Sequence, residues 1–144
     1  MSDVSQILDE KGHDVLRIDA GASVFEAVTA MVAANVGSLL VMQDGAIAGI
    51  FTERDYLRRV AVEGRTEEET AVSDVMSTPL VIVTPNTSVD ECMALMTERR
   101  IRHLPVADGR NVVGMVSVGD LVKFKSDQQR FEIKFLHEYI GTGS

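Results

Sequence analysis

Two segments of the chain place a hydroxyl side chain and a carboxylate three residues apart, directly after an apolar run. They read Gly49-Ile-Phe-Thr52-Glu-Arg-Asp55 and Gly114-Met-Val-Ser117-Val-Gly-Asp120. If a helix begins at the hydroxyl residue, its first N–H groups and the positive end of its dipole favour a phosphate oxygen. The hydroxyl can donate to the same phosphate, and the carboxylate can accept hydrogen bonds from both hydroxyls of a ribose. An adenosine phosphate carries these groups together.

The same motif has a simpler interpretation as a helix N-cap. Ser and Thr cap helices by accepting a hydrogen bond from a backbone N–H group, and an acidic residue three positions later can reach back. For one motif alone, capping is the favoured interpretation. Two copies at equivalent places of a duplicated strand-helix unit favour ligand binding over capping alone.

The chain contains an internal repeat, and such a repeat decides the architecture of a protein. A shift of 65 residues superposes 15–58 on 80–123 without a gap. Upstream, 4–8 resembles 72–76 at an offset of 68 residues, so the first copy carries three extra residues. The matching pairs include Ser23 and Ser88, Met31 and Met96, Gly49 and Gly114, and Asp55 and Asp120. Chance does not explain this pattern well.

Each copy predicts the order strand, helix, strand, strand, helix. Short runs rich in β-branched residues predict the first strand at 15–18 and at 80–83. Ser23 and Ser88, each followed three residues later by a glutamate, predict a capping box where the first helix begins. Asp-Gly turns between apolar runs predict hairpins. The hairpin strands are expected at 38–42 and 46–51 and at 104–107 and 112–116, and the second helices near Glu53 and Gly119.

These elements define four segments of the chain. They are a first repeat over 2–62, an acidic linker over 63–71, a second repeat over 72–125, and an amphipathic C-terminal helix and tail over 126–144. One repeat alone buries little surface, so the two are expected to pack sheet to sheet as one pseudo-symmetric module of the α/β (α+β) class. In the last helix, an apolar stripe must pack on this domain or on a second subunit. It comprises Phe131, Phe135, Leu136 and Ile140.

Composition and charge exclude several classes of protein. The chain has 144 residues, 45% of them hydrophobic, which is too apolar for disorder, and it has no apolar run long enough to span a bilayer. A net charge of −8 opposes sequence-independent binding of nucleic acid. The acidic N-terminus and the single cysteine, Cys92, favour the cytoplasm, and Cys92 occupies an apolar helical position typical of a core. His13 and His137 lack the spacing of metal ligands, so no metal site is expected.

The repeated segments resemble a tandem pair of cystathionine-β-synthase (CBS) domains over about residues 2–125. The resemblance rests on the two Gly-hydrophobic-x-Thr/Ser-x-x-Asp segments, on 81–85 (Val-Ile-Val-Thr-Pro) and on 101–106 (Ile-Arg-His-Leu-Pro-Val). It implies one module with two clefts between the repeats, a homodimer, and regulatory binding of an adenosine ligand. AMP is the first expectation, and ADP, ATP, NAD(H) and S-adenosylmethionine are the alternatives.

The resemblance also implies a first binding site. Asp55 would bind the ribose, and Thr52 would face the phosphate. Arg102 and His103 would reach the phosphates from the second repeat, with Pro105 beside them.

A second site would use the other copy of the motif. Asp120 and Ser117 would take the same parts there, with Thr84 lining the base and ribose region. The first copy departs from this pattern, because Asp19 replaces the hydroxyl of Thr84. Its charge would repel a nearby phosphate, although it could pair with a ribose hydroxyl or an adenine amine. The remaining members of the expected binding set are Ile18, Ser38, Val83 and Pro85.

The two sites are expected to be unequal. Gly37-Ser38 replaces Arg102-His103 in the first copy, so the second site lacks a cation from the opposite repeat. Arg54 and Arg58 are the candidate substitutes for that cation. The sites should therefore differ in affinity or in ligand.

Three classes of function stay open for the chain. They are a regulatory sensor of an adenosine ligand that acts on a separate protein, a structural dimerisation module without a ligand, and a weak nucleotide hydrolase. No Ser-His-Asp, Cys-His or metal constellation is visible, so an enzyme is not expected. Arg99 and Arg100, at a helix end, are expected to lie in solvent.

Overall fold

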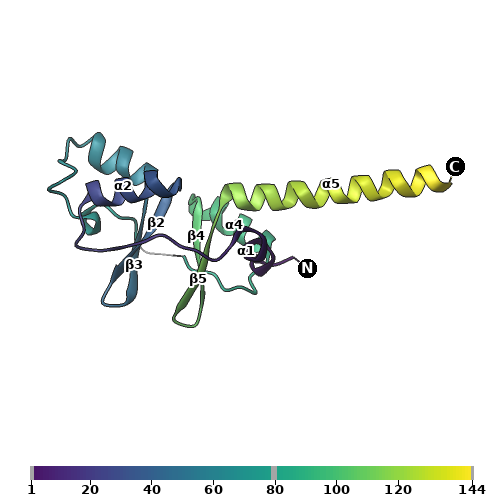
Figure 1. Ribbon diagram of the computed structural model, residues 1–144, viewed down its shortest axis with the longest axis horizontal. Coiled ribbons are helices and arrows are strands. Elements are labelled where there is room, and N and C mark those ends of the chain that lie inside the picture. The colour runs from purple at the N-terminus through teal and green to yellow at the C-terminus, as the bar shows by residue number, and fades with distance from the viewer. Residues whose placement is uncertain (1, 79–80, 144) are drawn as a thin grey trace.

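The computed structural model describes residues 2–78 and 81–143, with side chains described as far as residue 134. Two halves stand side by side, each with a β-hairpin and helices, and a long C-terminal helix projects away from this body (Figure 1). The first half spans residues 15–62 and the second half residues 81–127. Both halves follow the order of elements that the internal repeat predicts, apart from one strand of the second half.

The first half contains a three-stranded sheet with the order β1-β2-β3. Strand β1 (Arg17–Asp19) runs parallel to β2 (Ser38–Gln43), and β2 pairs antiparallel with β3 (Ala46–Thr52). The predicted Asp-Gly turn joins β2 to β3. Asp44 and Gly45 both adopt positive φ, 52° and 78°, as a two-residue type I′ hairpin requires. The three predicted strands of this half form, although β1 starts at Arg17 and not at residue 15 as predicted.

The second half contains a two-stranded sheet, in which β4 (His103–Asp108) pairs antiparallel with β5 (Asn111–Ser117). The prediction of a further strand over 80–83 is wrong in its extent. The first residue of that range lies outside the described part of the chain, and the next two have no strand geometry. Val83 forms one isolated parallel bridge with Val106. In this half, the described part of the predicted strand is therefore reduced to the one bridge at Val83.

One long helix in each half begins at the predicted serine. Helix α2 (Val24–Ala34) is capped by Ser23, and α4 (Val89–Arg99) is capped by Ser88. Each serine hydroxyl accepts a hydrogen bond from the N–H group of the glutamate three residues later, at 3.1 and 3.0 Å. Neither glutamate carboxylate returns a bond to its serine N–H group in the described structure. The helix starts are confirmed, but only the serine half of each capping box forms.

The helices that follow the two hydroxyl–carboxylate motifs differ in form. In the first half, α3 (Glu53–Asp55) is a single α-helical turn that continues as the π-helix η1 (Tyr56–Ala61). In the second half, α5 (Val118–Gly143) is an α-helix over its whole length. The predicted C-terminal helix is the continuation of α5 and not a separate element.

The structure contains one helix that no sequence pattern had predicted, α1 (Val4–Lys11). Asp3 caps it, and its apolar residues Val4, Ile7 and Leu8 are buried. Their spacing of three and four residues is the signal that could have identified the helix. Helix α1 packs beside β5 and α5 of the second half, and not on the repeat that it precedes (Figure 1).

The two halves exchange their leading segments. The 3-10 helix η2 (Val72–Asp74), which precedes the second repeat, packs into the core of the first half. Two glycines permit the close approach of these segments. A Cβ atom at Gly114 would lie 2.6 Å from Leu8 Cδ2, and one at Gly49 would lie 2.5 Å from Met76 Sδ. The sequence repeats and the packing units therefore differ at their N-terminal ends.

The two sheets pack face to face. Leu40 and Ile50 from the first sheet and Met115 from the second form a buried cluster between them. Each half also has its own larger core, built from its sheet, its helices and the exchanged segment. Sheet-to-sheet packing of two repeats confirms the predicted fold class.

The C-terminal part of α5 extends beyond the body (Figure 1). Of the predicted apolar stripe, Phe131 is 71% exposed. Phe135, Leu136 and Ile140 lie outside the range whose side chains are described. Among the described residues, no helix combines the length and the apolar character that a bilayer crossing needs.

Candidate functional site

A cleft of about 840 Å³ lies between the two halves. This volume falls within the range typical of small-molecule sites. One wall comes from the end of β3 and from α3 and η1, and the other comes from β4, the segment before it, and the start of α5. The predicted site residues that line it together are Thr52, Arg54, Asp55, Arg102, His103, Pro105 and Ser117.

Asp55 is the buried carboxylate of this cleft, 6% exposed. Its Oδ2 accepts a hydrogen bond from the Thr52 N–H group at 3.0 Å, and the Thr52 hydroxyl accepts one from the Asp55 N–H group at 3.1 Å. Its Oδ1 accepts a hydrogen bond from the Ser77 hydroxyl at 2.7 Å. The motif therefore does cap its helix. A carboxylate has about four acceptor positions, and these bonds leave two of them for a ligand.

Ser117 and Asp120 repeat this arrangement in the second half. The Asp120 N–H group donates to Ser117 Oγ at 3.1 Å, and the Ser117 N–H group donates to Asp120 Oδ2 at 2.8 Å. The third partner differs, because Lys11 donates from Nζ to Asp120 Oδ2 at 2.6 Å and to the Met115 carbonyl at 2.8 Å. Asp120 is not among the residues that line the cleft of Asp55. The two carboxylates thus have unlike partners, a neutral hydroxyl at Asp55 and a cation at Asp120.

Lys11 determines the charge state of Asp120. Burial raises the pKa of the Asp120 carboxyl, but the hydrogen bond from Lys11, the hydrogen bonds from Ser117 and the charge of Lys11 outweigh burial. Together they hold the pKa of Asp120 below its usual range. Asp120 is therefore ionised at neutral pH, and a ribose bound there would share it with an ammonium group.

His103 extends from β4 toward the first half. A Cβ atom at Gly37 would lie 3.9 Å from its Nε2. Burial and the charge of Lys11 lower the pKa of His103, and Arg102 acts in the same direction, while nearby carboxylates act against them. The net effect is a lowered pKa, so the imidazole is neutral at neutral pH. His103 can therefore offer a ligand a hydrogen bond but no charge, which leaves Arg102 as the cation of this pair.

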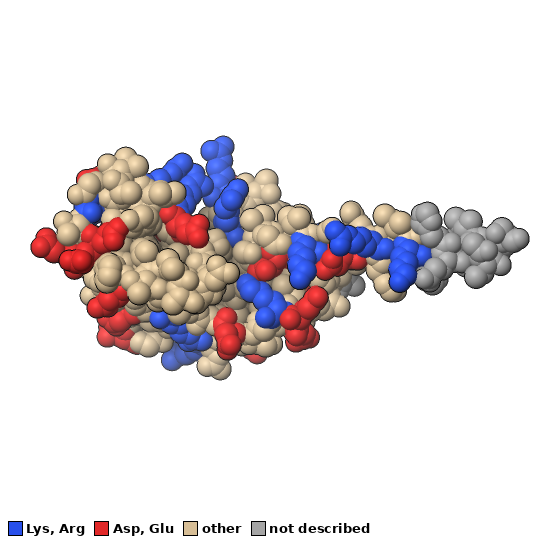
Figure 2. Space-filling model, turned by 45° about the horizontal axis from the view of Figure 1, so that its top comes forward, with Lys and Arg blue, Asp and Glu red and all other residues tan. Residues whose placement is uncertain are grey.

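Arginine is the prominent charged residue of the cleft. In Figure 2, Lys and Arg side chains gather in the upper middle of the body, where the two halves meet. Arginines enter the lining from α3 and η1 on one side and from the segment before β4 on the other. They are Arg54, Arg58, Arg59, Arg100 and Arg102.

Arg100 is exposed, as expected, and it also lines the cleft. Arg54 and Arg58 were expected to serve the second site, but they line the same cleft as Asp55. Lys11 is the cation that the structure places on Asp120.

The remaining predicted site residues lie outside this cleft. Asp19 ends β1, and its Oδ2 accepts a hydrogen bond from the Gly21 N–H group at 2.9 Å, which stabilises the following turn. Thr84 is exposed, and its N–H group donates to the Thr87 hydroxyl at 3.0 Å. The others are structural parts of strands, bridges or turns, namely Ile18, Ser38, Val83 and Pro85.

Sequence reasoning missed several residues that contact the two carboxylates or line the cleft. Ser77, which donates to Asp55, directly follows the segment 72–76, and Lys11, which donates to Asp120, follows 4–8 by three residues. The upstream part of the repeat was therefore the available signal for both. Nothing in the sequence indicated that Gly37, Glu53 and Arg59 would line the same cleft.

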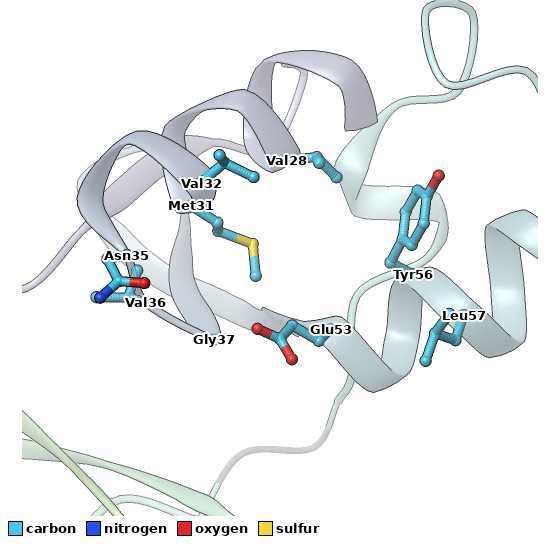
Figure 3. Close-up of a pocket in the computed structure, with 9 residues that line it drawn as sticks. All are labelled: Val28, Met31, Val32, Asn35, Val36, Gly37, Glu53, Tyr56 and Leu57. Carbon is cyan, nitrogen blue, oxygen red and sulfur yellow. The ribbon is translucent and has the colours of Figure 1, made fainter.

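A second hollow, the α2–η1 groove, lies on the helical face of the first half (Figure 3). It has a volume of about 480 Å³, with Val28, Met31 and Val32 from α2 on one side and Tyr56 and Leu57 from η1 on the other. Val32 is 74% exposed and Leu57 is 59% exposed. Exposed large apolar side chains that gather in this way are typical of an interaction surface.

The duplicated halves and their shared cleft have counterparts among known proteins. The CBS domain model matches residues 4–62 and 72–127. The mitochondrial CBS domain-containing protein CBSX3 of Arabidopsis thaliana is 41% identical over 149 residues, which cover 97% of this chain and 72% of the plant protein. The crystal structure of the CBS domain of NE2398 superposes with a TM-score of 0.82 at 44% identity and covers 86% of this chain and 97% of the other. The chain therefore belongs to the CBS-domain family.

A more distant structural neighbour contains bound adenosine derivatives. The CBS domain pair of protein MJ0100, in complex with 5′-methylthioadenosine and S-adenosyl-L-methionine, has a TM-score of 0.78 at 22% identity and covers 89% of this chain and 98% of the other. At this identity the likeness concerns the fold alone. CBS-domain pairs generally bind adenosine-containing ligands as regulatory modules, and proteins made only of CBS domains are typically not catalytic.

Proposed function

We propose that this chain is a regulatory module that binds an adenosine nucleotide in the cleft between its halves and modulates a separate protein. Asp55 carries the proposal, because it is a buried carboxylate in the lining of a cleft and has unused acceptor positions. Ribose hydroxyls would donate to Asp55, while phosphate oxygens would accept from Thr52 and from Arg102 across the cleft. The family supports the ligand class, because CBS-domain pairs generally bind adenosine-containing ligands.

A second, weaker adenosine site at Asp120 belongs to the same proposal, with its motif partner Ser117 lining the cleft of Asp55 as well. Because Lys11 already holds Asp120, a ribose gains less there than at Asp55. Titration calorimetry should therefore report two sites of different affinity, or one site. Two identical and independent sites would contradict this part of the proposal.

Carboxamide variants test the role of Asp55 with little change of shape. Thermal unfolding is measured with AMP, ADP, ATP and NADH, since a ligand selective for the folded state raises Tm. Asp55→Asn should abolish most of the Tm increase, because the amide accepts fewer ribose hydrogen bonds. The matched control is Asp44→Asn, at an exposed turn remote from the cleft, which should keep the whole increase. No Tm increase for the wild type with any of these ligands would refute the proposal.

The proposed action is regulation in the cytoplasm rather than catalysis. Among the described residues, no cluster of three or more His, Cys, Asp or Glu side chains is placed to hold a metal ion. The alternative of a weak nucleotide hydrolase is tested by incubating the protein with ATP and ADP and analysing the products. Recovery of the intact nucleotides supports regulation, and steady release of phosphate by the wild type would overturn it.

The α2–η1 groove favours dimerisation as a second function of the same chain. The groove is apolar, and its rim residues Val32 and Leu57 are mostly exposed in the single chain. A homodimer that covers this helical face would remove them from water. The groove and the nucleotide cleft share Gly37, Glu53 and Leu57, whereas Val32 lines the groove but not the cleft. A variant at Val32 therefore separates dimerisation from ligand binding.

A further inference from the structure

The positive charge of the cleft exceeds what one phosphate group requires. Five arginines line it, whereas Glu53 and Asp55 are the acidic residues of its lining. In the described side chains, none of these arginines forms an ion pair with a carboxylate. The chain as a whole carries a net charge of −8, so this concentration of arginine does not follow from composition.

Three of these arginines line the cleft from one side, Arg54 from α3 and Arg58 and Arg59 from the π-helix η1. Arg59 Nη1 also donates to the Val75 and Met76 carbonyls, at 3.3 and 2.7 Å. The hydrogen bonds of η1 span five residues, as between the Val62 N–H group and the Leu57 carbonyl at 3.1 Å. In so wide a turn, residues four and five positions apart share a side, which aligns Arg54 with Arg58 and Arg59. A regular α-helix, with 3.6 residues per turn, would rotate Arg59 away from Arg54. The equivalent part of α5 is a regular α-helix, so the π-helix is not a property of the repeat itself.

A fourth arginine occupies an unfavourable backbone conformation. Arg100 ends α4 with a left-handed φ of 55°, and the equivalent residue of the first half is Asn35, with φ 54°. Asn tolerates this conformation better than Arg does. Of the two equivalent residues, Arg100 lines this cleft, whereas Asn35 lines the α2–η1 groove. Strain at such a position points to a functional use of the side chain, here its charge.

These observations identify the charge class of the ligand. We infer that the cleft binds a nucleoside di- or triphosphate in preference to a nucleoside monophosphate, and that it disfavours a sulfonium ligand. The inference rests on the proposed function. A monophosphate brings a charge of about −2, which leaves most of the guanidinium groups uncompensated. Each further phosphate adds negative charge and oxygens that guanidinium groups bind in bidentate fashion. A sulfonium cation would be repelled by the same groups.

The test compares ATP, ADP, AMP and S-adenosylmethionine by titration calorimetry at low salt, without divalent cations. The wild type should bind ATP at least about tenfold more tightly than AMP, since one charged hydrogen bond changes affinity by roughly that factor. S-adenosylmethionine should bind more weakly than AMP. Added salt should weaken ATP more than AMP, because screening acts on each charge.

Single arginine variants test whether the arginines of the cleft cause the preference for ATP over AMP. Arg54→Ala and Arg58→Ala should each reduce the ratio of ATP to AMP affinity about tenfold, by loss of one charged contact. Both side chains are exposed and make no described hydrogen bond, so the variants should fold normally. The matched control is Arg110→Ala, at the exposed turn between β4 and β5, which should leave the ratio unchanged.

The outcomes separate this inference from the proposed function. If AMP binds as tightly as ATP, or if neither arginine variant changes the affinity ratio, the inference is wrong. The proposed function then still stands, provided that Asp55→Asn weakens both nucleotides. If no adenosine nucleotide binds the wild type, both proposals are wrong.

Discussion

Leu8 of α1 lies over Gly114 of β5 so closely that a Cβ atom at Gly114 would come within 2.6 Å of Leu8 Cδ2. Leu8 is 1% exposed and belongs to the core of the second half. This contact fixes the N-terminal helix on the later repeat, and the same helix carries Lys11 to Asp120. Because glycine has no side chain, Gly114 leaves room for Leu8, and the packing of α1 on the second half depends on this room.

We predict that Gly114→Ala lowers the free energy of unfolding by about 1–3 kcal/mol, the usual cost of overpacking a core. Leu8 is buried and has little room to move away from the new methyl group. Chemical denaturation measures the change. The control is Gly119→Ala in the first turn of α5, where the nearest atom to a new Cβ, Ser117 Oγ, is 3.6 Å away. That variant should be neutral or more stable by up to about 1 kcal/mol, and equal stability of both variants would contradict the packing argument.

Replacement of Lys11 should change the titration of Asp120. In Lys11→Met, burial is no longer outweighed by the ammonium group, so the pKa of Asp120 should rise. In the wild type, the lowered pKa contributes stability that is present above the ordinary value of 3.8 and is lost as pH falls through the folded-state pKa. The variant should therefore lose this acid-side contribution. Carbon-13 NMR titration of the carboxyl group measures the pKa directly.

A second exposed ion pair supplies the control for this experiment. Lys125 pairs with Asp90 on α4, in the same half but with other partners. Lys125→Met removes an equal charge and should leave the pKa of Asp120 nearly unchanged. If both lysine variants shift Asp120 equally, then net charge and not the Lys11 contact determines its pKa.

His103 should make the stability of the protein depend on pH near neutrality. Burial and Lys11 lower its pKa in the folded state below the ordinary value of 6.5, so the unfolded chain binds more protons between the two values. The free energy of unfolding should therefore fall as pH is lowered from 6.5 toward the folded-state pKa. His103→Gln should flatten this part of the profile. Identical pH profiles for wild type and His103→Gln would contradict the prediction.

The α2–η1 groove should be part of a homodimer interface. Leu57→Asp places a charge in the groove and should weaken self-association at least about tenfold, because a buried unpaired charge is costly. Light scattering over a range of concentrations measures the association. The control is Ile82→Asp, an apolar residue 46% exposed that is not in the groove. A wild type that stays monomeric, or a Leu57→Asp variant that stays as dimeric as the wild type, would overturn this assignment.

Local patterns predicted the parts of the fold that local forces determine. The Asp-Gly turn at Asp44 and the caps at Ser23 and Ser88 depend on neighbouring residues alone, and the structure confirms them. The strand expected over 80–83 reduces to a bridge at Val83, because strand pairing depends on a partner distant in sequence. The same kind of apolar run therefore forms the paired strand β1 in the first half and an isolated bridge from Val83 to Val106 of β4 in the second.

The sequence by itself determined the duplication, the fold class and the two hydroxyl–carboxylate motifs, because periodicity and capping act over a few residues. Only the tertiary structure decided which residues share the cleft. Arg54 and Arg100 meet there from opposite halves, and Lys11 reaches Asp120 across more than a hundred residues of chain. The physical reason is the exchange of leading segments: burial of apolar surface drives Leu8 onto Gly114, and no local rule states on which repeat that helix will pack.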